Sequence, residues 1–145
     1  MTAATAFDWL NLVVMPWWAL YLAAPRSALA LRAASHGGVF LALGSTYAVL
    51  LVAALVTGPG GGVGYEGVHA TLTAPLGFLA GWTHYLVFDL FVGAWIVRES
   101  RRIEVGPRPF LLFTLLAGPI GLGSFLVRRW WRLRSLSQIG QPDLA

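Results

Sequence analysis

Four long apolar stretches, separated by short polar segments, dominate the chain. They cover residues 6–24, 37–57, 73–97 and 109–127, and each is about as long as a helix that crosses the hydrocarbon core of a membrane. The fourth contains Gly118-Pro119-Ile120-Gly121, which should kink or break a helix. The pattern predicts an all-α integral membrane protein, a bundle of four transmembrane helices with a kinked or broken fourth helix.

The polar segments indicate one transmembrane domain over residues 1–134, followed by a polar tail at 135–145 that we expect to be mobile. Between the spans we expect three connections. They are an alanine-rich interfacial linker at 25–36, a glycine-rich loop with surface residues at 58–72, and a polar loop at 98–108.

Arginines at the ends of the apolar stretches bear on membrane orientation. If all four stretches cross, the loops at 25–36 and 98–108 share one side and hold six arginines. Four more arginines follow the fourth stretch and lie on the other side, with both termini. Because basic residues favour the cytoplasm, the larger group favours termini outside it.

Composition supports a membrane protein and excludes several functions. Hydrophobic residues make up 57% of the chain, and its mean hydropathy is +0.70. All ten basic residues are arginine, so a retinal Schiff base, which needs lysine, is excluded. The chain has no cysteine, so thiolate chemistry is excluded too. We assign the net charge of +4 to membrane topology and anionic lipid, not to nucleic acid.

The third stretch carries ionisable residues well inside an apolar run. Such residues are expensive in a membrane and usually functional, which draws attention to His84 and Asp89. On a helix, His84 shares a stripe with Gly77 and Gly81, a pair of small residues that lets another backbone approach and should place His84 inside the bundle. Asp89 falls on an adjoining stripe with Trp82 and Tyr85.

These residues suggest an acid and a base, with Asp89 as the candidate acid and His84 as the candidate base. His84 and Asp89 point about 140° apart on one helix, so each needs a partner from elsewhere. We expect the Asp8 and Asn11 face of the first helix to supply it, near the carbonyl that Pro119 frees. The candidate catalytic residues are Asp89, His84, Asp8, Asn11 and Tyr85. Two structural alternatives stay open, in which Asp8 is a helix cap or headgroup-level residue and the His84 and Asp89 side chains only link the bundle.

Three histidines without a His-x-x-His or His-x-x-x-His spacing cannot form the di-iron site of a membrane oxygenase, so we expect no metal site. Aromatic residues at helical spacing suit contact with a long polyene, although helix packing or an interfacial belt explains such rings as well. The candidates for pigment contact are Trp82, Phe88, Phe91 and Trp95.

Three segments, in this order and spacing, resemble the abscisic-acid-deficient-four-like membrane family over roughly residues 7–130. They are Phe7-Asp8-Trp9-Leu10-Asn11 with Pro16-Trp17, Trp82-Thr83-His84-Tyr85-Leu86-Val87-Phe88-Asp89, and Gly118-Pro119-Ile120-Gly121-Leu122. Plant members of that family are chloroplast neoxanthin synthases. The resemblance implies a four-helix membrane protein that binds a carotenoid and isomerises the epoxide end group of a xanthophyll.

Such an isomerisation needs an acid and a base but no redox cofactor, which agrees with the groups present. The sequence leaves open whether the protein is an enzyme. The alternative is a non-enzymatic subunit of a pigment-binding membrane complex, in which His84 ligates the magnesium of a chlorophyll-type pigment. We expect the lipid bilayer and a carotenoid or other pigment as partners, within a homo-oligomer or membrane complex. The absence of a transit peptide favours a bacterial inner membrane.

Overall fold

We analysed a computed structural model of the chain, which describes residues 2–59 and 62–134. These residues form six helices. They are α1 (Ala3–Ala23), α2 (Ala28–Ser35), α3 (Gly38–Thr57), α4 (Tyr65–Thr73), α5 (Pro75–Arg102) and α6 (Arg108–Leu133). The predicted tail at 135–145 lies outside the described residues.

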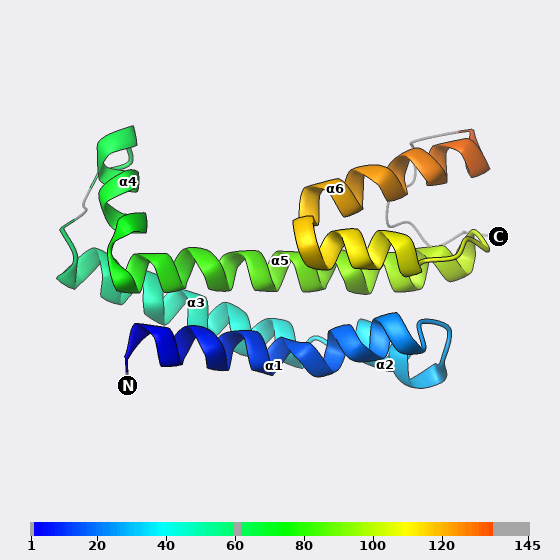
Figure 1. The fold of residues 1–145 in the computed structure, drawn as a ribbon, viewed down its shortest axis with the longest axis horizontal. Coiled ribbons are helices and arrows are strands. Elements are labelled where there is room, and N and C mark those ends of the chain that lie inside the picture. The colour runs from blue at the N-terminus through cyan, green and yellow to red at the C-terminus, as the bar shows by residue number, and fades with distance from the viewer. Residues whose placement is uncertain (1, 60–61, 135–145) are drawn as a thin grey trace.

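Helix α5 is the axis of the fold and contacts every other described helix (Figure 1). It begins at Pro75, a residue that suits the first turn because its missing N–H has no partner there. Helices α1 and α3 run beside α5, α2 continues beyond the start of α3, and α4 stands across the first turn of α5. The core lies between these helices and includes Val14, Trp18 and Tyr21 of α1, all almost fully buried.

Helix α6 turns back on itself partway along its length. Its backbone leaves the helical conformation at Ala117 (φ −159°, ψ 75°), two residues before Pro119. In Figure 1 the first half lies along α5, and the second half returns toward the end at which α6 began. The kink predicted from Gly118 and Pro119 is therefore confirmed, and it is a reversal of the chain.

Contacts between the two halves of α6 establish the reversal. The rings of Phe110 and Phe125 lie 5.3 Å apart, whereas fifteen residues of continuous helix span roughly 22 Å. Nearer the turn, a Cβ atom on Gly121 would overlap the backbone nitrogen and Oγ1 of Thr114. Glycine at position 121 thus allows the second half to pack against the first.

By length and composition, three of the described helical segments can cross a membrane. They are Ala28–Thr57, Pro75–Arg102 and Arg108–Leu133. Helix α1 is not among them, because Asp8, Asn11 and its tryptophans lower its hydropathy. The all-α fold is confirmed, and its long apolar helices support an integral membrane protein, whereas the count of four spans is not confirmed.

Two of the predicted connections contain short helices. Helix α2 lies in the linker at 25–36, whose alanine content also suits a helix, whereas α4 forms where the sequence indicated a loop and ends at Thr73. Ser27 begins α2 by accepting a hydrogen bond from the Ala30 N–H at 3.1 Å. Residues 98–102, predicted as loop, continue α5, since Glu99 and Ser100 are buried against the rest of the fold.

The glycine stripe on α5 has a different partner from the one predicted. Gly77 and Gly81 pack against Thr71 and Leu72 of α4, not against another long helix. The close approach of two long helices occurs instead at Gly93, which is buried beneath the Trp18 ring of α1. Small residues on an apolar helix therefore predicted that a neighbour approaches, but not which one.

The reversal of α6 also corrects the predicted positions of the chain ends. The start of α1 packs near the start of α5, around Phe7 and Phe78. The end of α6 lies beside the other end of α5, where the Arg132 Nε donates to the carbonyl oxygen of Ile103 at 3.3 Å. The N-terminal residues and Arg134 thus lie at opposite ends of the molecule, not on one side as predicted (Figure 1).

A buried ionic cluster fastens the returning half of α6. The Arg129 side chain is fully buried, and its Nε donates to Glu99 Oε1 at 2.7 Å. Arg102 donates to both oxygens of the same carboxylate, at 2.9 and 2.7 Å. A buried guanidinium and carboxylate are stable only while their partners are in place, so this cluster fixes where α6 ends.

We predict that Glu99→Gln lowers the free energy of unfolding in detergent by roughly 3 to 5 kcal/mol, because it removes the carboxylate that faces buried Arg129. Glu104→Gln is the matched control. Glu104 is 82% exposed, and its oxygen lies 3.8 Å from Arg132, so its loss should cost less than about 1 kcal/mol. Equal stabilities of the two variants in thermal unfolding would refute a structural role for the cluster.

A second pair of variants tests the α6 reversal. Gly121→Ala should lower the unfolding temperature, because the added Cβ meets the backbone of Thr114. Gly123→Ala, two residues away with no atom near the added Cβ, should preserve or raise that temperature, since alanine favours a helix by about 1 kcal/mol. If Gly121→Ala is as stable as Gly123→Ala, the two halves of α6 do not pack as described.

Candidate functional site

A cavity of about 340 Å³ lies where α1, α5 and the turn in α6 meet. Its volume is at the lower end of the range for small-molecule sites. Most of its wall is apolar, and the polar side chains come from α1 and α5. The lining residues are Asn11, Val14, Met15, Trp18, Trp82, Tyr85, Leu86, Asp89 and Leu115 to Pro119.

One side of the cavity is held by a hydrogen bond between two helices. The Trp82 Nε1–H of α5 donates to Asn11 Oδ1 of α1 at 3.2 Å. The Asn11 amide nitrogen in turn donates to the Phe7 carbonyl oxygen at 2.8 Å, which fixes the orientation of the amide. The Phe7 ring packs on Trp82 with centroids 4.9 Å apart. These contacts position both polar groups at the cavity wall before any ligand binds.

The Asp89 carboxylate lies against the turn in α6. A Cβ atom on Gly118 would overlap Asp89 Oδ1, so only glycine leaves room for the carboxyl group there. The second half of α6 begins at this point, and the first N–H groups of a helix attract negative charge. Among the described residues, no polar group is in hydrogen-bonding position to the Asp89 side chain. The carboxyl group is therefore held in place by packing but remains available to a ligand.

The backbone of the turn adds an acceptor to the cavity. Pro119 has no N–H to donate to the Leu115 carbonyl, and the non-helical Ala117 moves the following residues out of register. Leu115 and Ala117 both line the cavity. The residue whose carbonyl Pro119 frees therefore belongs to the same cavity as Asp89.

The rim of the cavity is exposed at the surface of the bundle. Met15 is 41% exposed, Tyr85 60% and Leu116 74%. On a membrane protein, apolar surface of this kind faces lipid. A lipid-soluble molecule would therefore reach Asp89 from the hydrocarbon region, without passing through water.

The structure brings some predicted catalytic residues together and separates others. Asn11, Tyr85 and Asp89 line the same cavity. Asp8 does not line it; it is exposed in the second turn of α1, and it is not the helix cap, because Thr2 caps α1. The predicted meeting of α1 with the third long helix occurs, but through Asn11 and Trp82.

His84 lies on a different face of α5 from the cavity. Its ring is 5.6 Å from that of Tyr47 in α3 and 4.5 Å from that of Phe88. The side chain is exposed at the surface of the bundle, so the expectation that the glycine stripe would bury it is wrong. The angle of about 140° between residues 84 and 89 explains the separation, because one helix cannot turn both side chains toward one cavity.

The aromatic residues predicted for pigment contact also fall into separate groups. Trp82 lines the cavity. Phe91 packs against Phe40 of α3 with centroids 5.6 Å apart, and Trp95 packs edge-on against Phe125 at 5.2 Å. Phe88 is 56% exposed. Only Trp82 is placed for direct contact with a ligand beside Asp89.

Sequence reasoning did not predict that Gly118 lies against the Asp89 carboxyl group in this cavity. The available signal was a glycine directly before a proline inside an apolar helix, which we interpreted only as a kink. Reasoning from sequence also missed Val14 as a lining residue, because an apolar side chain among other apolar side chains carries no signal of a cavity. In the described part of the chain there is no cluster of three metal-ligating side chains.

Comparison with known proteins identifies the sequence family. Residues 5–125 match the family described as ABA DEFICIENT 4-like. No curated protein and no solved structure matches the chain significantly. The matched range includes the whole cavity, from Asn11 to Pro119.

The exposure of Asp89 to lipid-soluble molecules can be measured directly. A hydrophobic carbodiimide, which modifies protonated carboxyl groups, should label Asp89 in membranes, because the cavity opens to lipid and the carboxyl group has no ionic partner among the described residues. Glu99 should stay unlabelled, since two arginines hold it as a carboxylate. Peptide mass spectrometry distinguishes the two sites. Labelling of Glu99 in preference to Asp89 would contradict the described cavity.

Proposed function

Because the chain belongs to the ABA DEFICIENT 4-like family, we propose that it binds a carotenoid end group in the Asp89 cavity and isomerises an epoxide there. Neoxanthin synthase of plants belongs to this family. The observation that carries the proposal is the placement of Asp89. It is a membrane-embedded carboxyl group without a protein hydrogen-bond partner among the described residues, and it lies in a cavity that opens to lipid.

The chemistry requires one proton donor and one proton acceptor. A protonated carboxyl group donates its proton to the epoxide oxygen, and the bond from that oxygen to the ring carbon next to the polyene breaks. A proton then leaves the adjacent chain carbon, whose electrons form the second double bond of an allene. The product is an isomer of the substrate, because one proton is gained and one is lost. No oxidant or reductant takes part.

Asp89 fills both roles in this proposal. Among the cavity-lining residues, Asp89 and Tyr85 are the only ones with an ionisable side chain. A carboxyl group has two oxygens, so the carboxylate left after proton donation can accept the proton from carbon and be regenerated. His84, the base suggested by sequence, faces α3 and takes no part in this step.

The remaining cavity residues would orient the substrate. The Asn11 amide, the Trp82 ring and the Tyr85 hydroxyl line the same space as Asp89 and can contact the ring and its hydroxyl group. A volume of about 340 Å³ suits one ring end group, and the polyene would extend past exposed Leu116 into the lipid. Proximity between the epoxide and a fixed carboxyl group then supplies much of the rate enhancement.

The test is conversion of an added epoxy-carotenoid such as violaxanthin by the purified protein. Asp89→Asn should lower turnover by about 10²-fold or more, because the amide has nearly the shape of the carboxyl group but cannot transfer its proton. His84→Gln is the matched control, and its turnover should equal that of the wild type. Binding of the carotenoid and the yield of protein should be near normal for both variants.

Two results would count against the proposal. Wild-type turnover by Asp89→Asn would make this residue structural. A large loss with His84→Gln would show that the reaction occurs on the α3 side of α5, outside the cavity. If Asp89→Asn fails to accumulate, Gly118→Ala provides a second test, because its Cβ displaces the carboxyl group without removing it.

The exposure of His84 favours one other function, that of a pigment-binding subunit. Its imidazole lies at the bundle surface near the rings of Tyr47 and Phe88, where a flat magnesium-containing pigment could stack and accept a nitrogen ligand. Purification in mild detergent distinguishes the two functions. A chlorophyll-type absorption band that His84→Gln abolishes supports the subunit, whereas a colourless protein that converts an epoxy-carotenoid supports the enzyme.

A further inference from the structure

The arginines of this protein are gathered at one end of the molecule. The contacts of three of them bring the ends of α1, α5 and α6 together. Arg108 donates to the last carbonyl oxygens of α1, those of Leu22 and Ala23, at 3.0 and 2.9 Å. Arg129 and Arg132, near the end of α6, bind Glu99 and Ile103 at the end of α5. All the arginines lie in four segments that Figure 1 shows in the same half of the molecule: α2 with the connection before it, the last turns of α5, the start of α6 and the end of α6. They are Arg26, Arg32, Arg98, Arg101, Arg102, Arg108, Arg128, Arg129, Arg132 and Arg134.

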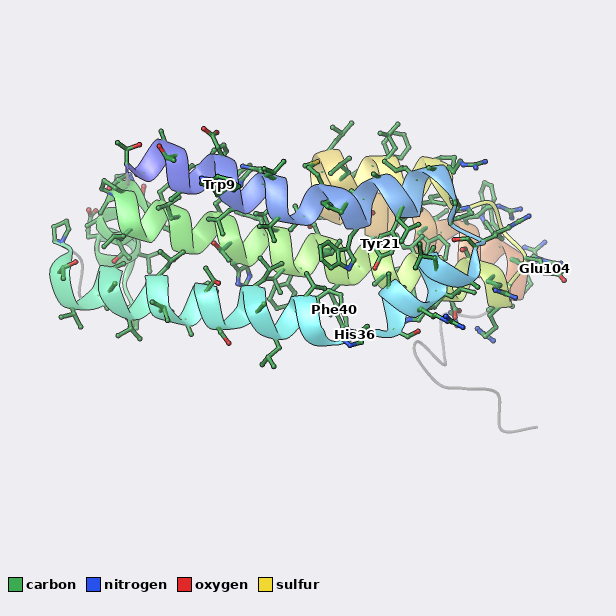
Figure 2. The ribbon with its side chains drawn as sticks, turned by 90° about the horizontal axis from the view of Figure 1, so that it is seen from below. Trp9, Tyr21, His36, Phe40 and Glu104 are labelled. Carbon is green, nitrogen blue, oxygen red and sulfur yellow. The ribbon has the colours of Figure 1, made fainter. Side chains whose placement is uncertain are left out.

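This arginine end also includes the loop between α1 and α2. Arg26 and Arg108 line one surface depression together, so the two loops are adjacent. The acidic residues there are Glu99, which is buried in its ion pairs, and exposed Glu104. Figure 2 shows Glu104 at this end, with most of the side-chain nitrogen atoms around it. The arginine end therefore has a large excess of positive charge.

The opposite end has no basic residue in its described part apart from His69. It is formed by the start of α1, by α4 and by the start of α5, whose residues line a common depression. Its charged side chains are Asp8 and Glu66, both exposed. The two ends of the molecule thus differ in the sign of their charge.

The turn in α6 produces this separation. The halves of α6, residues 108–116 and 118–133, are about 13 and 24 Å long. Both are shorter than the roughly 30 Å of a bilayer core. As a straight helix antiparallel to α5, α6 would place its last four arginines at the opposite end. Because it turns at Ala117, the positive charge of the chain is collected at one end.

We infer that α6 is a re-entrant hairpin, and that the arginine end docks on the anionic lipid headgroups of the cytoplasmic leaflet. Basic residues favour the cytoplasmic side of a membrane. With α6 as a hairpin, the six arginines of the loops and the four at the end of α6 lie on one side, so both groups favour the same orientation. Helix α1 then crosses the membrane in place of α6, since its 21 residues reach about 31 Å, and the N-terminus lies on the other side. Anionic phospholipids of the cytoplasmic leaflet attract clustered basic residues, and guanidinium groups bind phosphate oxygens in pairs. This inference does not depend on the reaction proposed for the Asp89 cavity.

Accessibility of single cysteines tests the topology, because the native chain has none. Gly64→Cys and Gly106→Cys report the two ends, since a Cβ at either position meets no other atom. Trp131→Cys reports the end of α6, where the side chain is 60% exposed. In cells with a permeabilised outer membrane, an impermeant maleimide should label Gly64→Cys alone. In inverted vesicles it should label the other two.

Each departure from that pattern overturns the inference. Labelling of Trp131→Cys together with Gly64→Cys would mean that α6 crosses the membrane. Labelling of Gly106→Cys from outside would mean that the arginine end is not cytoplasmic. Failure of Trp131→Cys to react in inverted vesicles would mean that this end of α6 is not at the cytoplasmic surface.

Thermal unfolding in mixed micelles tests the lipid contact. Phosphatidylglycerol should raise the unfolding temperature of the wild type by several degrees more than phosphatidylcholine does, and added salt should reduce the difference. Arg101→Gln combined with Arg128→Gln should remove most of it, because both arginines are exposed. Glu66→Gln, at the opposite end, is the control and should keep it. Equal responses of wild type and double variant would overturn anionic-lipid docking.

Discussion

The reversal of α6 at Ala117 is the constraint on which the rest of the structure depends. A proline two residues later removes one backbone donor, and Gly118 and Gly121 leave room for Asp89 and for the first half of the helix. The apolar side chains on both halves pack against each other and against α5, which compensates for the broken helical hydrogen bonds. Without this turn the Asp89 cavity would lose the wall that closes it.

The same turn couples the interior of the protein to its charged end. Because the second half of α6 returns along α5, Arg129 reaches Glu99 in the buried core of the arginine end. The ion pair therefore holds the helix that positions Gly118 beside Asp89, although the two sites lie about ten residues apart along α5. A carboxyl group inside a membrane-spanning segment is costly and marks a functional site. The proposed reaction uses that group, and the buried ion pair maintains its position.

Much of the fold was predictable from sequence, because apolar length and proline placement are local signals. The apolar stretch at 73–97 predicted most of α5, and Pro119 marked the break in α6. The direction of the chain after the break was not predictable, since it depends on contacts such as Phe110 with Phe125, fifteen residues apart. For the same reason, sequence reasoning proposed His84, on the same helix, as the base that acts with Asp89. It did not identify Gly118, which lies against Asp89 in the cavity.

The distance between the two ends of α6 tests this account most directly. Spin labels on cysteines that replace Pro109 and Trp131, both exposed, can be introduced without removing any native cysteine. A continuous helix would separate these residues by about 33 Å. A hairpin, whose halves pack at the usual 8 to 10 Å between helix axes, should bring the labels within roughly 20 Å of each other. A measured separation above about 30 Å in lipid bilayers would contradict the reversal, and with it the cavity at Asp89 and the single arginine end.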